Sequence, residues 1–134
     1  MSKGGASTTT LRKIAKEKLK VKKGVYKNSS NGKRARISTQ SVDKLTSGIA
    51  MGKSKDNGFT EREHFESVAR VGQLYEKSKF ISSALDKNGN PDVVSVKRYE
   101  AKFKLRNGKR ATAFITVKEF KEGDDLIYSL ELRK

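Results

Sequence analysis

The chain has 134 residues, with 31 lysines and arginines against 15 aspartates and glutamates, a formal charge of +16 and a pI of about 10.1. The absence of cysteine excludes disulfides and thiolate chemistry, and a single histidine argues against a zinc site, which usually draws on several His or Cys ligands. We therefore expect no metal and no other cofactor, and a polyanionic partner, nucleic acid first.

Length and hydropathy predict one domain without a membrane anchor. Typical domains have roughly 100–150 residues. No stretch approaches the about 20 apolar residues of a membrane helix, and the opening "MSKGGASTTT" lacks the apolar region of a signal peptide. An anionic membrane surface and an acidic protein are the alternative partners for the positive charge.

Residues 1–36 predict a basic arm outside the folded domain, which then spans residues 37–134. The arm has 12 basic residues and one acidic residue, Glu17. A short basic helix is predicted by apolar residues at helical spacing: Leu11, Ile14, Ala15 and Leu19. It would dock weakly or order on a partner, whereas a solvated, partly disordered tail is the alternative.

Two segments precede the best-defined helix. Residues 37–48 predict a short helix that ends at Gly48. Residues 50–58, rich in glycine and lysine, predict a loop without the spacing of a phosphate-binding Walker motif. We expect Lys53 and Lys55 in this loop to bind nucleic acid.

The helix that follows begins with a capping box. The Thr60 hydroxyl can accept from the amide of Glu63, whose side chain can reach back. His64, the only histidine, comes next and projects toward the core side of the helix. It is therefore either a structural residue held by a hydrogen bond, or an acid or base whose pKa the helix dipole lowers.

From residue 79 onward the apolar period changes to two, which predicts a four-stranded antiparallel meander. The strands are residues 79–86, 93–106, 109–121 and 126–134. For the middle hairpin, a two-residue loop would place the two apolar sets on different faces. We therefore predict a three-residue loop with a glycine bulge, pairing Phe103 with Ala113 and Tyr99 with Val117. The fold class is α+β, with helices first.

The opposite face of this sheet collects cations, hydroxyls and one aromatic ring. It includes Arg98, Lys102, Thr112, Phe114, Thr116 and Lys118. A solvated sheet face is one interpretation. The other is a nucleic-acid platform, in which Lys102 contacts phosphate and Phe114 stacks on a base.

Four short motifs stand out between residues 57 and 132: "NGF…EH" (57–64), "VKRYEAKF" (96–103), "ITVKE" (115–119) and "IYSLEL" (127–132). With the element order, they give residues 37–134 a resemblance to toxin ribonucleases of the barnase/EndoU/colicin/RelE-like fold. These include C-terminal toxin domains of phage-borne, polymorphic and contact-dependent growth inhibition systems.

The resemblance implies a metal-independent endoribonuclease toxin, acting on RNA and on tRNA first. The 2′-hydroxyl attacks the adjacent phosphorus and leaves a 2′,3′-cyclic phosphate. His64 would be the acid or base, and Arg98 and Lys118 would bind phosphate. Thr116 would orient a phosphate oxygen, and Tyr128 would donate a proton or stack. The resemblance also implies an acidic immunity protein, a free monomer and action in the bacterial cytoplasm.

Strand alternation conflicts with part of this site. It places Tyr128 on the apolar face, away from Arg98, Thr116 and Lys118, so Tyr128 is either a core residue or reaches around a sheet edge. His64 comes from the helix that should cover the apolar face. A non-catalytic RNA- or DNA-binding module, or a basic interaction domain of a larger phage or secretion protein, explains the same composition.

Overall fold

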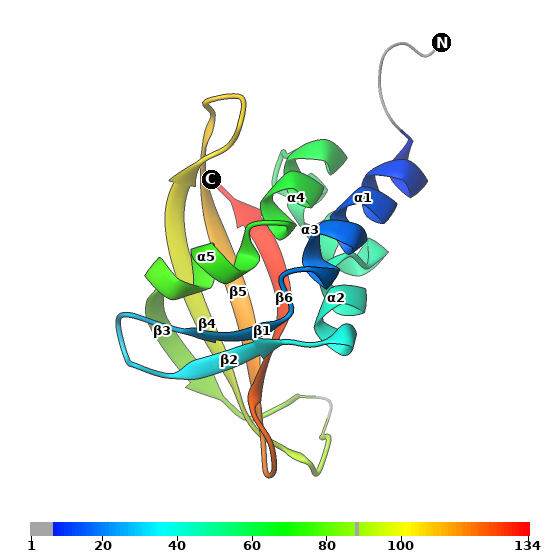
Figure 1. Ribbon diagram of the computed structural model, residues 1–134. Helices are drawn as coiled ribbons and strands as arrows, with labels where there is room; N and C mark the ends of the chain where they lie inside the picture. The colour runs from blue at the N-terminus through cyan, green and yellow to red at the C-terminus, as the bar shows by residue number, and fades with distance from the viewer. Residues whose placement is uncertain (1–6, 88) are drawn as a thin grey trace.

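A computed structural model describes residues 7–87 and 89–134 and confirms the α+β class (Figure 1). The helices are α1 (Thr8–Lys20), α2 (Thr39–Leu45), α3 (Gly48–Asp56), α4 (Glu61–Val68) and α5 (Val71–Lys77). The strands are β1 (Gly24–Lys27), β2 (Arg34–Ile37), β3 (Lys79–Ala84), β4 (Val93–Lys104), β5 (Arg110–Phe120) and β6 (Asp125–Arg133).

The strands of the described residues form one mixed sheet in the order β1-β2-β6-β5-β4-β3. The four predicted strands are indeed consecutive antiparallel neighbours, from β3 to β6. The prediction of a four-stranded antiparallel sheet is nevertheless wrong, because β1 and β2 form a hairpin and β2 pairs in parallel with β6. The sequence of β2, "RARI", alternates between charged and apolar residues as a strand does. Because two of its four residues are arginines, it was assigned to the basic arm instead of the sheet.

The described part of the predicted arm, residues 7–36, belongs to the fold. Leu19 and Ala35 are fully buried in the main core, and the predicted boundary at residue 36 falls inside β2. The predicted short helix is present as α1, which packs Leu11 and Ala15 against Phe65 of α4. Since a helix needs only one apolar stripe to dock, the lysines of α1 occupy its other faces without preventing packing. Residues 1–6 lie outside the described residues.

Helix caps depend on residues close together in the chain, and of the two caps that begin α3 and α4 one was predicted from the sequence. The capping box of Thr60 and Glu63 is confirmed at the start of α4. The loop predicted for residues 50–58 is wrong, because α3 covers most of it. Its N-cap is Ser47, whose hydroxyl accepts from the amide of Ala50. The Ser47 cap thus starts a helix in a segment whose glycine and lysine content predicted a loop.

The β4–β5 hairpin has the predicted loop length. Residues 106–108 form the loop, the amide of Leu105 donates to the carbonyl of Lys109 at 2.8 Å, and Gly108 has a φ of 87°. The predicted pairs are each shifted by two residues, so that Phe103 pairs with Ala111 and Tyr99 with Ile115. An even shift keeps every side chain on its predicted face.

The apolar face of the sheet is covered by α5 and by the β1–β2 hairpin, which folds across it, while α2, α3 and α4 lie beside β6 (Figure 1). The buried Asn28 amide ties the hairpin to the end of α5, donating to the carbonyls of Tyr75 at 2.7 Å and Ser78 at 2.9 Å. These elements do not cover the opposite, polar face of β4, β5 and β6, which lines a pocket.

Two helical glycines should respond oppositely to alanine. A Cβ at Gly72 in α5 would lie 2.5 Å from the ring of Tyr26. This ring is held in place because the Tyr26 hydroxyl donates a hydrogen bond to the Lys22 carbonyl. A Cβ at Gly52 in α3 meets nothing within 4 Å. We expect Gly72→Ala to lower the free energy of unfolding by about 1–3 kcal/mol. Gly52→Ala should raise it by about 0.5–1 kcal/mol through helix propensity. Urea unfolding measures both, and equal stabilities would contradict the close packing at Gly72.

Candidate nucleic-acid interface

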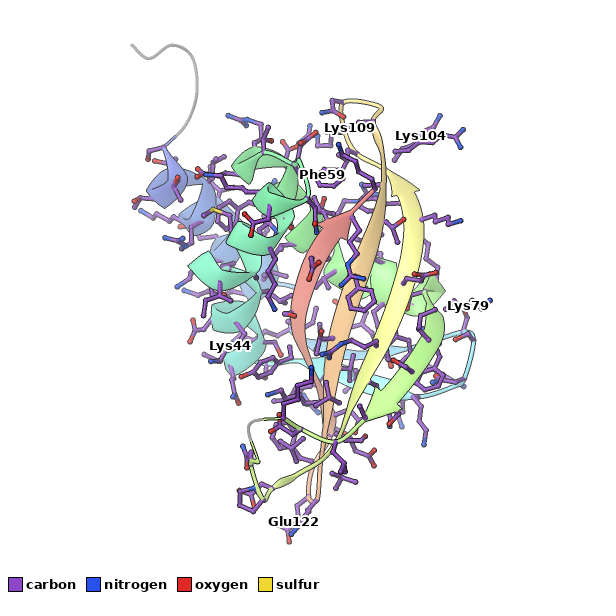
Figure 2. The ribbon with its side chains drawn as sticks, turned by 180° about the vertical axis from the view of Figure 1, so that it is seen from behind. Lys44, Phe59, Lys79, Lys104, Lys109 and Glu122 are labelled. Atoms are coloured by element: carbon purple, nitrogen blue, oxygen red, sulfur yellow. The ribbon has the colours of Figure 1, made fainter. Side chains whose placement is uncertain are left out.

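Cross-strand rows organise the polar face of the sheet, which Figure 2 shows from the side opposite to that of Figure 1. Arg98 of β4 pairs with Thr116 of β5, which pairs with Ser129 of β6. The next row along the strands is Glu100, Phe114 and Glu131, and the one after it is Lys102, Thr112 and Arg133. Successive rows on one face are about 7 Å apart, because each strand residue advances about 3.3 Å.

A β-bulge in β6 brings Tyr128 to this face. Thr116 pairs with Ser129 but Val117 pairs with Ile127, which leaves Tyr128 as the extra residue. The Lys118 Nζ lies 3.9 Å from the centre of the Tyr128 ring. The prediction that Tyr128 lies on the apolar face is therefore wrong, because simple alternation does not foresee an inserted residue. The bulge joins Tyr128 to Thr116 and Lys118.

These side chains line a pocket of about 460 Å³, which we call the Arg98 pocket. Its walls are the polar face of β4, β5 and β6, the start of α3, and the segment that follows β3. The charged lining residues are Lys44, Lys53, Asp86, Lys87, Arg98, Lys118 and Glu131. Two exposed apolar residues, Ile49 and Leu85, also line it. The pocket thus combines five cations with two carboxylates.

Arg98 offers an unused donor. Its Nη1 atom is buried and has no hydrogen-bond partner among the described residues. Burial and the positive charge of Arg133 lower the pKa of Arg98, against the opposing effect of Glu131. A guanidinium nevertheless stays protonated in proteins. A buried, unpaired cationic donor is costly for the fold, and an anion in the pocket would satisfy it.

Lys118 is held between a ring and a carboxylate. Its Nζ lies 3.9 Å from the Asp86 Oδ1 as well as above Tyr128, and the residue is buried. Asp86 therefore offsets part of the Lys118 charge, whereas no carboxylate forms an ion pair with Arg98 in the described part of the chain. Arg98 is the stronger candidate for a phosphate contact.

Glu131 is an ionised carboxylate in the same pocket. Burial by itself would raise its pKa, but hydrogen bonds from Arg133 and Asn57 outweigh burial and lower the pKa. The Asn57 amide donates at 3.0 Å and the Arg133 Nε at 2.9 Å. The sequence alone assigned no role to Glu131. It also missed Asp86, which follows β3.

His64 lies outside this pocket, in the interior. Its Nδ1 is 2.8 Å from the Ser54 Oγ and its Nε2 is 3.4 Å from the Leu45 carbonyl, and the residue has no exposed surface. Burial lowers its pKa to about 4, partly opposed by the hydrogen bond to Leu45. Since Ser54 also accepts from the Leu132 amide, the imidazole links α2, α3 and α4 to β6. His64 is not among the residues that line the Arg98 pocket.

The predicted nucleic-acid-binding residues separate into two groups. Lys53 lines the Arg98 pocket, whereas Lys55 forms an ion pair with Glu61 at 3.3 Å on the other side of α3. Phe114 and Lys102 lie further along the polar face. One face of the Phe114 ring is covered by Arg133, whose Cζ lies 3.7 Å from the ring centre. A base could therefore reach the guanidinium plane of Arg133 rather than Phe114 itself.

Comparison with known families assigns the chain. A family model described as large polyvalent protein-associated domain 3 matches residues 6–128. The chain belongs to this family. No curated protein and no solved structure matches it. The match to large polyvalent protein-associated domain 3 starts before α1 and extends into β6, so it includes the basic helix and the β1–β2 hairpin. It does not confirm the resemblance to the barnase/EndoU/colicin/RelE-like toxins.

Two further findings describe this large polyvalent protein-associated domain. Among the residues that the structure describes, no three His, Cys, Asp or Glu side chains gather where they could hold a metal ion. No helix in residues 7–87 or 89–134 is long and apolar enough to cross a membrane.

Proposed function

We propose that this domain binds RNA on the polar face of its sheet and cleaves it in the Arg98 pocket without a metal ion. The observation that supports this most directly is the buried, unpartnered Nη1 of Arg98 beside Thr116 and Tyr128. A guanidinium fork can grip two phosphate oxygens and stabilise the charge that develops on them in the transition state. The formal charge of +16 favours a polyanionic substrate.

The side chains of the pocket can supply both proton transfers. The 2′-oxygen forms a bond to phosphorus while the bond from phosphorus to the 5′-oxygen breaks. Glu131, ionised at neutral pH, accepts the proton of the 2′-hydroxyl, and the Tyr128 phenol gives its proton to the leaving 5′-oxygen. Lys118, above the ring, stabilises the phenolate that remains. The products are a 2′,3′-cyclic phosphate and a 5′-hydroxyl, and His64 takes no part.

Incubation of the purified chain with total bacterial RNA tests the reaction. We expect cleavage to persist in excess EDTA, and the new ends to carry a 2′,3′-cyclic phosphate and a 5′-hydroxyl. Separation of the products shows whether tRNA is cut first. Intact RNA, both with EDTA and with added divalent ions, would refute the enzymatic proposal.

A non-catalytic RNA-binding module is the second candidate. It is favoured by the ion pair of Lys118 with Asp86, which reduces the positive charge available for chemistry. This reading predicts RNA binding that weakens steeply with salt and no new RNA ends. Under either proposal, an acidic protein that covers the Arg98 pocket would act as an inhibitor.

A further inference from the structure

A second cleft lies on the same face of the sheet, toward the β4–β5 loop. It has a volume of about 490 Å³, and we call it the Lys104 cleft. Four basic residues line it, Lys102, Lys104, Arg110 and Lys134, and Thr112 lines it as well. No aspartate or glutamate is among its described lining residues, and in the part of the chain that the structure describes none of these four cations forms an ion pair with a side-chain carboxylate. Lys102, Lys104 and Arg110 are exposed on neighbouring strands, whereas the ammonium of Lys134 lies beside Gly58. The three neighbouring positive charges repel one another, so an anion bound here would relieve that repulsion.

The two sites are aligned along the same strands. Lys104 pairs directly with Arg110, and it lies six residues along β4 from Arg98, a separation of about 20 Å at the rise of a strand. In Figure 2, Lys104 lies toward the end of the sheet opposite to the segment that follows β3. At the roughly 3.4 Å spacing of stacked nucleotides this distance corresponds to about six nucleotides, and to fewer in a stretched strand.

A stacking surface lies between the two sites. Arg133 covers the Phe114 ring at 3.7 Å, and its side chain is 47% exposed. The ring below and the hydrogen bond from its Nε to Glu131 hold the guanidinium in place. Unpaired bases stack on arginine planes as they do on aromatic rings, and a paired base in a duplex cannot present its face in this way.

We infer that the Lys104 cleft is a second phosphate site for a single RNA strand, which runs from the Arg98 pocket across Arg133 to the cleft. The inference rests on the proposed binding of RNA and not on its cleavage. The cleft lengthens the bound strand and makes affinity depend on substrate length. It also selects single strands over duplexes, because the bases between the two sites stack on Arg133.

The variant Lys104→Gln/Arg110→Gln tests the cleft with a 12-nucleotide single strand of 2′-fluoro RNA, which has no 2′-hydroxyl and cannot be cleaved. Each phosphate contact to a single strand contributes about 0.7 to the slope of log affinity against log salt, so the slope should fall by about 1.4. At 0.1 M salt this corresponds to about 25-fold weaker binding. Binding of a dinucleotide, which cannot span both sites, should stay the same.

The matched control is Lys13→Gln/Lys20→Gln, which removes the same charge from exposed positions of α1. Equal losses in the two double variants, or equal losses for the 12-mer and the dinucleotide, would overturn the inference. So would tighter binding of a 12-base-pair duplex than of the single strand. If the 12-mer binds as expected but natural RNA is not cut, the cleavage proposal fails and the cleft assignment stands.

Arg133→Lys tests the stacking surface separately. The change keeps the positive charge but removes the guanidinium plane. We expect weaker binding of the 12-mer with an unchanged salt slope, since no charge is lost. An unchanged affinity would show that the bases do not stack on Arg133.

Discussion

Replacement of Arg98 by glutamine is expected to slow RNA cleavage by about 100- to 1,000-fold, the usual cost of removing one preorganised donor to a developing oxyanion. The Nη1 atom is already buried without a partner, so its interaction with phosphate requires no reorganisation when RNA binds. Arg98→Lys should restore only part of the rate, because a lysine is a point charge and cannot grip two oxygens at once.

The stability of the fold should not fall in the Arg98→Gln variant. Removing the buried, unsatisfied Nη1 donor relieves a desolvation cost, so the Tm of Arg98→Gln should equal or exceed that of the unchanged chain. Arg62→Gln is the matched control, since it removes the same charge from a half-exposed position on α4. Cleavage rates within about twofold for Arg98→Gln and Arg62→Gln would contradict the phosphate-binding role of Arg98. The rates are measured with a labelled RNA oligonucleotide and the Tm by circular dichroism.

Acidification from pH 7.5 to pH 4 is expected to lower the free energy of unfolding by about 3 kcal/mol through His64 alone, at about 1.4 kcal/mol per unit of pKa difference. The folded pKa of His64 is about 4, below the ordinary value of 6.5. The folded state thus favours the neutral ring, and the unfolded state binds the proton more tightly. The His64 contribution is complete above pH 6.5 and is lost as the pH falls to about 4.

Comparison with His64→Gln isolates this effect. At pH 7.5 the variant should be less stable by about 1–3 kcal/mol, because the buried partners of the ring at Ser54 and Leu45 lose their hydrogen bonds. Between pH 6.5 and pH 4 the free energy of unfolding of His64→Gln should change less than that of the unchanged chain. Burial raises the pKa of Asp125, which has the opposite effect on stability but is present in both proteins, so it cancels in the difference. Parallel pH profiles from urea unfolding would contradict the assignment.

This prediction also separates a structural His64 from a catalytic one. A structural ring predicts that His64→Gln cuts RNA at a nearly unchanged rate below its Tm, since no atom of His64 reaches the Arg98 pocket. A catalytic ring predicts loss of cleavage in a folded variant. Rates and unfolding curves from the same preparation therefore distinguish the two.

Local patterns in the sequence were enough to predict several elements. The Thr60 capping box, the four strands from β3 to β6 and the three-residue length of the β4–β5 loop were all predicted from residues close together in the chain. The strand pairing beside that loop was predicted two residues away from where it lies. Period-two alternation also placed Arg98, Thr116 and Lys118 on one face, because successive strand side chains point to opposite faces.

Other features depended on contacts between distant segments. The β1–β2 hairpin becomes part of the sheet only because β2 pairs with β6, about ninety residues later. The sequence did not predict this pairing, because a strongly basic composition is shared by solvated tails and by docked elements that have only one apolar stripe.

The site shows the same division. Strand alternation determined which strands carry the cations, but one extra residue in β6 decided that Tyr128 joins them, and a bulge has no clear signal in a single sequence. The helix pattern placed His64 on an inward face, and only the packing of α2, α3 and β6 around it decided that the ring is enclosed. Spacing along a strand or helix is determined locally, whereas burial and the convergence of side chains depend on which distant segments pack together.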